Sequence, residues 1–262
     1  MLKKIVGRTC GILLGTLLIS GLAYADCSLL PNQATLQLAL AGAQSASNGG
    51  FGLNMWATIV DRDGVVCAVA FTGANRGDQW PGSRVISAQK ANTANSFSLP
   101  GLSLSTANLY SAVQPGGSLF GLQESNPVNV AVAYALPSSA YGTGADPMVG
   151  GKIGGVNVFG GGLALYAKNP SDAAHPILLG AVGVSGDSSC ADHNIAWRTR
   201  HTLNLDYVPA GVSGQAGHAD NIVYDIKTHP FQMNGVSDAG WGHPACSDAA
   251  TSISKSLPAT QH

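Results

Sequence analysis

Two β-rich runs face each other across a tight turn in the first third of the chain. The runs cover 53–60 and 65–71, and the four residues between them read Asp-Arg-Asp-Gly from position 61. Such a turn between two β-rich runs predicts a hairpin. The turn also resembles the start of a calcium loop, but the later ligands and the closing Glu are missing, so a plain turn is expected. A hairpin here directs the chain toward an antiparallel sheet.

Helical and strand-like segments follow one another along the rest of the chain. Apolar residues at helical spacing predict helices over 33–47, 83–97, 104–113 and 188–201. Strands are expected over 128–136 and 177–184, and the glycine-broken region 153–166 is expected to form a second hairpin. This order predicts one α/β domain over 26–204, an antiparallel sheet flanked by helices. Residues 205–262 lack clear periodicity and are expected to be an irregular C-terminal extension.

The first 25 residues have the three parts of a secretory signal peptide. Basic residues at positions 3, 4 and 8 precede an apolar run over 12–19, and Ala-Tyr-Ala ends at position 25. The apolar run is shorter than the ~20 residues that a spanning helix needs. We therefore expect residues 1–25 to be removed before Asp26, giving a periplasmic or secreted protein with no stable membrane anchor.

Four cysteines follow the expected cleavage site. They are Cys27, Cys67, Cys190 and Cys246, and their spacing fits no zinc-finger pattern. In an oxidising compartment four cysteines can form up to two disulfides, with three alternative connectivities. We expect a bridge between Cys190 and Cys246, which would fasten the extension to the domain.

The charge of the chain argues against a nucleic-acid partner. Lys and Arg number 13 and Asp and Glu 14, so the formal net charge is −1. No basic run follows the first eight residues, whereas a nucleic-acid binder needs a positive patch to neutralise phosphates. The hydrophobic share of 45% argues against disorder. The expected partner is a small molecule.

Lys90 and Thr93 lie one turn apart on an expected helix, on the same face. Lys90 could pair with a carboxylate of a ligand, and Thr93 could donate a hydrogen bond to it. The alternative is that Thr93 bonds to a helix carbonyl while Lys90 is solvated. The Gly183-Val-Ser-Gly186 turn before a helix could hold an anion on its backbone N–H groups. The alternative is that these glycines serve tight turns and close strand packing.

His193 and Trp197 lie one turn apart on the expected helix 188–201. His201 lies on the same face, and one of the two histidines could bind an iron while Trp197 stacks on the edge of a porphyrin. The alternative is an amphipathic helix that docks its Trp on the sheet. Nucleophilic catalysis has little support, because Ser185 stands in Gly-Val-Ser-Gly-Asp, where Asp replaces the last Gly of a nucleophile elbow.

Three motifs, in their order and spacing, resemble those of the GlcG/HbpS-like family. They are the Ile59-Val-Asp-x-x-Gly64 hairpin, the helix Ala88-Gln-Lys-Ala-Asn-Thr-Ala94, and the strand Gly180-Ala-Val-Gly-Val-Ser-Gly186, followed by Asp192. The resemblance covers residues 33–203. Some members of that family bind haem, and others accompany glycolate or cobalamin metabolism. The resemblance implies a profilin-like fold and a ring-shaped or layered homo-oligomer.

The shared motifs also mark where a common site is expected. The cofactor-binding residues implied by the resemblance and by the turn before the helix are Lys90, Thr93, Gly183, Ser185, Gly186, Asp192 and His193, with His193 as the metal ligand. The sequence departs from the family at His193, where the family has an acidic residue, at insertions over 137–155 and 167–176, and in the extension.

The sequence is compatible with three functions. The leading hypothesis is an exported protein that binds haem or a related tetrapyrrole. The first alternative is an enzyme that acts on a small organic acid, with Lys90 and Asp192 as acid and base groups. The second alternative is a structural homo-oligomer without a ligand.

Overall fold

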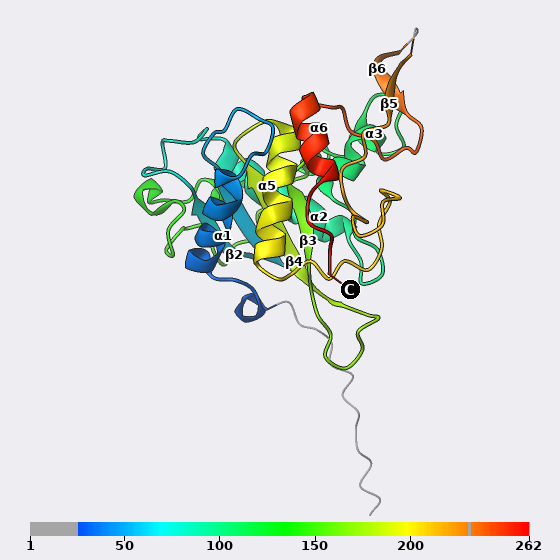
Figure 1. Cartoon of the computed structure of the whole chain (residues 1–262). Coiled ribbons are helices and arrows are strands. Elements are labelled where there is room, and N and C mark those ends of the chain that lie inside the picture. The colour runs from blue at the N-terminus through cyan, green and yellow to red at the C-terminus, as the bar shows by residue number, and fades with distance from the viewer. Residues whose placement is uncertain (1–25, 230–231, 262) are drawn as a thin grey trace, which may run out of the picture.

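The computed structural model describes residues 26–229 and 232–261, and the expected signal peptide lies outside these ranges. Its helices and strands are η1 Cys27–Leu29, α1 Gln33–Ser45, β1 Trp56–Asp61, β2 Val66–Phe71, α2 Ser83–Phe97, η2 Thr106–Leu109, α3 Tyr110–Val113, α4 Val130–Ala133, η3 Ser138–Ala140, β3 Gly162–Ala167, β4 Ile177–Ser185, α5 Ser189–Thr202, β5 Ile226–His229, β6 Gln232–Ser237 and α6 Asp248–Lys255 (Figure 1). Across the two described ranges, no helix combines the length and the apolar character that crossing a bilayer requires.

Four strands form one antiparallel sheet in the order β2-β1-β4-β3. The predicted hairpin is confirmed: β1 pairs with β2, and the carboxylate of Asp61 accepts the backbone N–H groups of Asp63 and Val65 at 2.9 and 3.0 Å. These two bonds hold the turn closed. On its other side β1 pairs with β4, and β4 pairs in turn with β3. The sheet flanked by helices matches the fold class that the sequence predicts.

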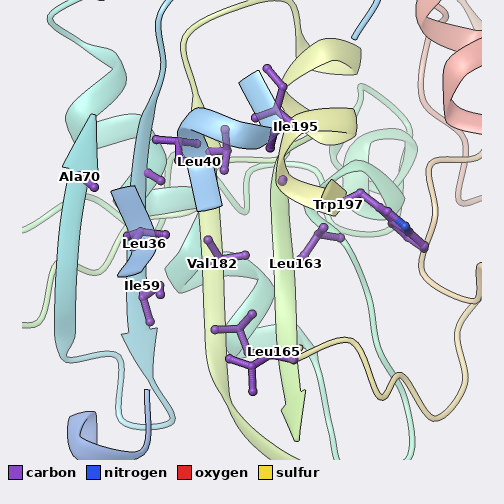
Figure 2. Close-up of a cluster of buried hydrophobic side chains, with 14 of the residues drawn as sticks. Leu36, Leu40, Ile59, Ala70, Leu163, Leu165, Val182, Ile195 and Trp197 are labelled. Atoms are coloured by element: carbon purple, nitrogen blue, oxygen red, sulfur yellow. The ribbon is translucent and has the colours of Figure 1, made fainter. Parts of the chain in front are cut away.

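Helices cover both faces of the sheet. Figure 1 shows α1 and α5 on one face and α2 on the other. Figure 2 shows the core beneath α1 and α5, in which Leu36 and Leu40 meet Ile59 and Val182 of the sheet and Ile195 of α5. A central strand has both faces buried, and all six residues of β1 are buried.

On the opposite face α2 lies very close to β4. Its inward positions are small, Ala88, Ala91 and Ala94, and all three are fully buried. A Cβ atom added to Gly183 would lie only 2.0 Å from the carbonyl oxygen of Ser87 in α2. Gly183 is therefore needed for the close approach of helix and strand.

Two sequence predictions are wrong. Residues 128–136 do not form a strand: they contain the short helix α4, whose N–H groups at Ala131 and Val132 are capped by the side chain of Asn129. The region 153–166 is not a hairpin either, because only β3 lies in it, and a single bridge joins Val128 to Gly154. The Asn129 side chain, which caps two N–H groups, favours a helical turn at the start of the valine-rich run.

Both disulfides are formed. The predicted bridge between Cys190 and Cys246 is confirmed, and a second bridge joins Cys27 to Cys67. Two disulfides fit an oxidising compartment. The Cys190–Cys246 bridge ties the extension to the beginning of α5.

The extension is more regular than its sequence predicts. It contains the two-stranded β5–β6 sheet and the helix α6, and α6 packs beside α5 (Figure 1). The extension also contributes side chains to the buried interior, including Asp220, Asn221 and His243. It is therefore part of the folded unit around α5.

Candidate functional site

The beginning of α5 is the point where most of the predicted site residues converge. Ser188 is the N-cap, and its side chain accepts the backbone N–H of Ala191. In the turn before it, the carboxylate of Asp187 accepts the N–H groups of Phe51 at 2.9 Å and Leu53 at 3.2 Å. These bonds fix the path from β4 into α5.

Lys90 and Asp192 form a buried ion pair between α2 and α5. The Lys90 ammonium lies 2.7 Å from the Asp192 carboxylate and also donates to the carbonyl oxygen of Val184 at 3.0 Å. The second Asp192 oxygen accepts the N–H of Asp187 at 2.8 Å. Both side chains are almost fully buried. The alternative in which Lys90 is solvated is wrong, because its charge is enclosed between a helix and a strand.

Burial dominates the protonation of this pair. It lowers the pKa of the Lys90 ammonium, against the attraction of Asp192. It raises the pKa of the Asp192 carboxyl to about 6, against the attraction and the hydrogen bond of Lys90. The two pKa values thus move toward each other, which brings proton exchange between the groups closer to neutral pH.

The other predicted residues of α2 and β4 have local partners. Thr93 donates to the carbonyl oxygen of Gln89 at 2.7 Å and accepts the N–H of Asn157 at 3.0 Å. Ser185 is buried at the end of β4. A Cβ at Gly186 would lie 2.5 Å from the carbonyl oxygen of Asn54, so this glycine allows two backbones to meet. In the described chain these positions shape the packing around the Lys90–Asp192 pair.

His193 points away from that pair, toward the extension. Its Nε2 lies 3.1 Å from Oδ1 of Asn221, whose own amide donates to the carbonyl oxygen of Ser254. Nε2 therefore carries the hydrogen and donates it. Burial lowers the pKa of His193 to about 3, so the ring is neutral at pH 7. Its Nδ1 is buried and has no hydrogen-bond partner among the described residues.

Trp197 packs between α5 and the extension. Its ring centroid lies 6.1 Å from that of His193, and the ring of His218 stacks on it at 5.5 Å. Its indole N–H donates to the carbonyl oxygen of Pro258 at 2.9 Å. The helix docks its Trp, as the alternative to porphyrin stacking predicts. The ring packs on the core that Figure 2 shows and also beneath the extension.

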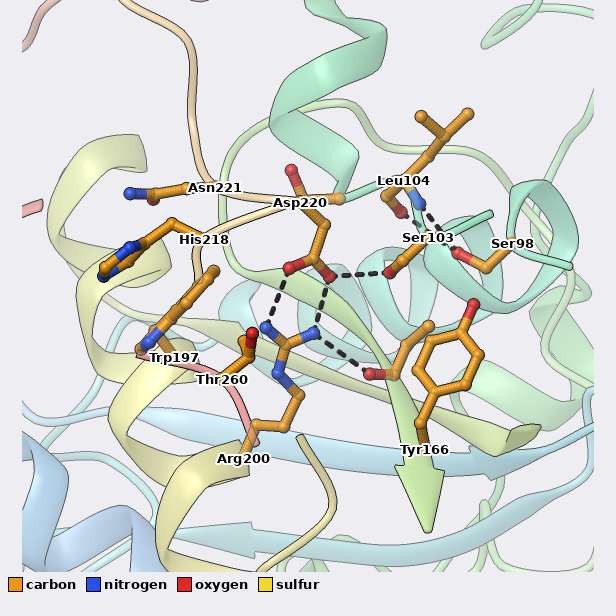
Figure 3. Close-up of polar contacts among 12 residues, drawn as sticks. Ser98, Ser103, Leu104, Tyr166, Trp197, Arg200, His218, Asp220, Asn221 and Thr260 are labelled. Atoms are coloured by element: carbon orange, nitrogen blue, oxygen red, sulfur yellow. Dashed lines mark hydrogen bonds and ion pairs between the residues drawn. The ribbon is translucent and has the colours of Figure 1, made fainter. Parts of the chain in front are cut away.

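A second buried ion pair involves Arg200, about two turns after Asp192 on α5. Figure 3 shows the Arg200 guanidinium reaching both oxygens of Asp220, at 2.6 and 2.9 Å, while Ser103 donates to the same carboxylate at 2.6 Å. Arg200 also donates to the carbonyl oxygen of Ala164 at 3.2 Å. Periodicity gives no sign of this pair, because Asp220 lies in a segment without a regular pattern.

A serine–histidine pair also escaped the sequence reasoning. The Ser189 hydroxyl lies 2.8 Å from Nε2 of His243. Ser189 precedes Cys190 by one residue, and His243 precedes Cys246 by three. The predicted disulfide was therefore the signal that could have brought these two residues together.

Five of the cavities formed by the described residues have volumes of about 180 to 490 Å³. None of these five is lined by Lys90, Thr93, Asp192 or His193. Among the described residues, the three His, Cys, Asp or Glu donors close enough to share a metal ion are Cys27, Asp61 and Cys67, and both sulfurs are in a disulfide. The predicted residues thus meet around α2 and α5 without enclosing one of these cavities.

Comparison with known proteins gives one strong match. The family model described as "Haem degrading protein HbpS-like" matches residues 30–200. No curated protein matches the chain.

Several solved structures share part of the fold. A PduOC–haem complex is 23% identical over 66% of this chain and 91% of its own, with a TM-score of 0.44. Protein ORFY of Klebsiella pneumoniae is 24% identical over 65% and 88%, with a TM-score of 0.41. A double mutant of HbpS from Streptomyces reticuli is 16% identical over 75% and 99%, with a TM-score of 0.43. At TM-scores below 0.5 these structures add nothing to the family match.

Proposed function

We propose that this chain, which belongs to the family of HbpS-like haem degrading proteins, binds haem or a related tetrapyrrole. The observation that carries this proposal is the family match over residues 30–200. That range contains the whole four-stranded sheet, α2 and most of α5.

The chemistry of His193 fits haem iron. A neutral imidazole nitrogen with a free lone pair is a common iron ligand, and the buried Nδ1 of His193 has no hydrogen-bond partner. Its other nitrogen donates to Asn221, the arrangement that orients a ligating histidine. Haem would supply the iron centre, and His193 would hold it.

The extension controls access to His193. Asn221 lies on one edge of the ring, and His218 occupies the face of Trp197 on which a porphyrin would stack. A tetrapyrrole reaches His193 only when this segment of the extension moves aside. We therefore place the ligand between α5 and the extension.

Lys90, Thr93, Asp192 and the Gly183–Gly186 turn complete the proposed site. The first turn of α5 presents a partial positive charge, and Lys90 adds a full charge that Asp192 neutralises. A propionate of the ligand would compete with Asp192 for Lys90.

A haem titration followed by the Soret band tests the proposal. The wild-type chain is expected to saturate at one haem per chain, and His193→Ala is expected to lose the histidine-ligated spectrum. His201→Ala is the matched control, because His201 lies on the same helix with its ring partly exposed and paired with Asp206. A His193→Ala spectrum identical to that of the wild type would place the iron elsewhere.

A second candidate function, action on a small organic acid, is favoured by one observation. The pKa values of Lys90 and Asp192 are shifted toward each other, as in a pair that moves a proton. A thermal-shift screen of small organic acids separates the two functions, because a ligand that binds only the folded state raises its melting temperature. A stabilising acid whose effect is lost in Asp192→Asn supports the enzyme.

We also propose that the protein is periplasmic or secreted and that it forms a homo-oligomer. The two disulfides support an oxidising compartment, and the family resemblance supports the oligomer.

A further inference from the structure

Ser189 and His243 meet at the boundary between α5 and the extension. Ser189 is the first residue of the 14-residue helix α5, and His243 follows β6 in the chain. The hydroxyl oxygen lies 2.8 Å from Nε2 of His243. The imidazole is buried, whereas Ser189 is only half-buried.

The hydrogen positions in this pair follow from its other partners. Nδ1 of His243 lies 2.7 Å from the carbonyl oxygen of Pro244, which can only accept, so Nδ1 carries the hydrogen. The ring is neutral at pH 7, because burial lowers the pKa of His243 to about 4. Nε2 therefore presents a lone pair, and the Ser189 hydroxyl donates to it. This is the order of nucleophile, base and orienting group that activates a serine.

The surroundings favour negative charge on the Ser189 oxygen. The backbone N–H of Gly160 donates to this oxygen at 2.7 Å. The N-terminus of α5 adds a partial positive charge, and the Lys90 ammonium acts on the same region, since it also lowers the pKa of His243. These groups favour the loss of the Ser189 hydroxyl proton to His243.

The pair is held in place from two sides. The Cys190–Cys246 disulfide joins the residue after Ser189 to a residue three positions after His243. The ring of Tyr110 packs against the imidazole with centroids 4.9 Å apart. A pair held in this way loses little entropy when it reacts.

Tyr110, whose ring packs against His243, also lines a neighbouring cavity of about 310 Å³ formed by α3 and the β5–β6 hairpin, and Ser189 and His243 lie outside its lining. Its lining is made of serine, glycine and small apolar residues with one glutamine, and no lining residue is charged. A neutral substrate suits this cavity better than an acid, which separates it from the site proposed for a tetrapyrrole.

We propose that Ser189 and His243 form a catalytic dyad that hydrolyses small neutral carboxylic esters. The Ser189 oxygen forms a bond to the carbonyl carbon while its hydrogen passes to Nε2 of His243. The carbon–oxygen bond to the alcohol breaks, and the alcohol leaves with that proton. Water then attacks the acyl-serine and gives a proton to Nε2. Ser189 recovers that proton as the carboxylic acid is released, so the sum is ester plus water to acid plus alcohol.

A fluorophosphonate probe tests the dyad on the full, disulfide-bonded chain. The Ser189 oxygen is expected to take the phosphorus with loss of fluoride, and mass spectrometry is expected to find one adduct per chain at Ser189. Ser189→Ala is expected to remove the adduct, and Ser252→Ala, which removes an exposed hydroxyl on α6, is expected to keep it. His243→Gln is expected to slow labelling and p-nitrophenyl acetate turnover by about 10²- to 10⁴-fold.

The pH profile of the wild type gives a readout that needs no variant. Labelling is expected to be independent of pH above about 5 and to fall as His243 is protonated through its pKa of about 4, while circular dichroism reports that the fold persists. No adduct at Ser189, wild-type labelling in folded His243→Gln, or a rate that rises tenfold per pH unit into the alkaline range would each overturn the dyad.

Discussion

Arg200 of α5 and Asp220 of the extension are joined by two hydrogen bonds, and neither side chain is exposed. Burial raises the pKa of Asp220, but the charge and hydrogen bonds of Arg200, with the hydroxyl of Ser103, hold it below its ordinary value. A buried carboxylate that stays charged in this way depends on its partner. The pair therefore fastens the extension to the domain from within.

Asp220→Ala is expected to lower the free energy of unfolding by about 3–5 kcal/mol, because it leaves the Arg200 charge buried without a counter-charge. Urea denaturation measures the loss. Asp238→Ala is the control, since Asp238 and its partner Lys227 are both exposed. The interpretation fails when the two variants unfold at the same urea concentration.

Lys90→Met is expected to destabilise the chain by a similar amount, about 3–5 kcal/mol, because Asp192 then lies buried without its cation. The double variant Lys90→Met with Asp192→Asn removes both charges and is expected to recover part of the loss. The double-mutant cycle measures the coupling of the two side chains. Losses that simply add would show that the pair carries no coupling.

Acid is expected to destabilise the chain below pH 6.5. His193 and His243 have folded pKa values of about 3 and about 4, below the ordinary 6.5, so between these limits the unfolded chain binds more protons. Stability is fully present above pH 6.5 and falls as the pH drops, by about 1.4 kcal/mol per pH unit for each histidine; between pH 6 and 4 the Asp192 carboxyl, whose folded pKa of about 6 lies above its ordinary 3.8, offsets the share of one histidine.

Melting temperatures of the wild type and of His243→Gln, taken from pH 7 to pH 4, check this dependence. The variant is expected to show a shallower slope, because one of the two buried neutral rings is gone. A wild-type melting temperature that stays constant from pH 7 to pH 4.5 contradicts the assignment of two neutral histidines.

Exported chain is expected to begin at Asp26 and to contain no free thiol. Peptide mapping by mass spectrometry should find Cys27 linked to Cys67 and Cys190 linked to Cys246. Replacing Cys190 and Cys246 by Ser is expected to cost about 4 kcal/mol in the chain-entropy model for a loop of 56 residues. Four free thiols in exported material would contradict the bridges.

Light scattering of the exported chain is expected to give a multiple of the mass of one chain. Leu38, Phe51 and Leu136 are large apolar side chains, each more than three-quarters exposed in the single chain. Burial of such side chains between copies removes apolar area from water. A monomer at micromolar concentration contradicts the assembly.

The regular elements around the sheet could be predicted because their patterns are local. Helix α2 lies at 83–97, as its spacing of alanines and valine indicates, and β4 follows the apolar run 177–184 closely. The run 128–136 has the same β-branched character, but the Asn129 side chain caps a helical turn there, and no strand of the described sheet pairs with it. Asn129 is visible in the run, but its role as a cap is not, because valines also favour strands.

The candidate site could be predicted only as a set of residues. The motifs brought Lys90 and Asp192 into one region, and the structure shows them in contact. Sequence alone could not show that the pair is enclosed, nor that Asn221 and His243 return from the extension to meet α5, because these are contacts across 28 to 102 residues.

The extension packs over α5, and this contact determines where the chain can be truncated without loss of its fold. The family match stops at residue 200, yet Trp197 gives its indole hydrogen to Pro258, and Cys190 is bonded to Cys246. A chain cut after residue 200 would lose the partners of Trp197, Arg200 and Cys190. It would expose the indole ring, leave the guanidinium without its carboxylate and leave the thiol free. The limit of sequence similarity thus falls within α5, and we expect the smallest piece of this protein that folds on its own to extend through α6.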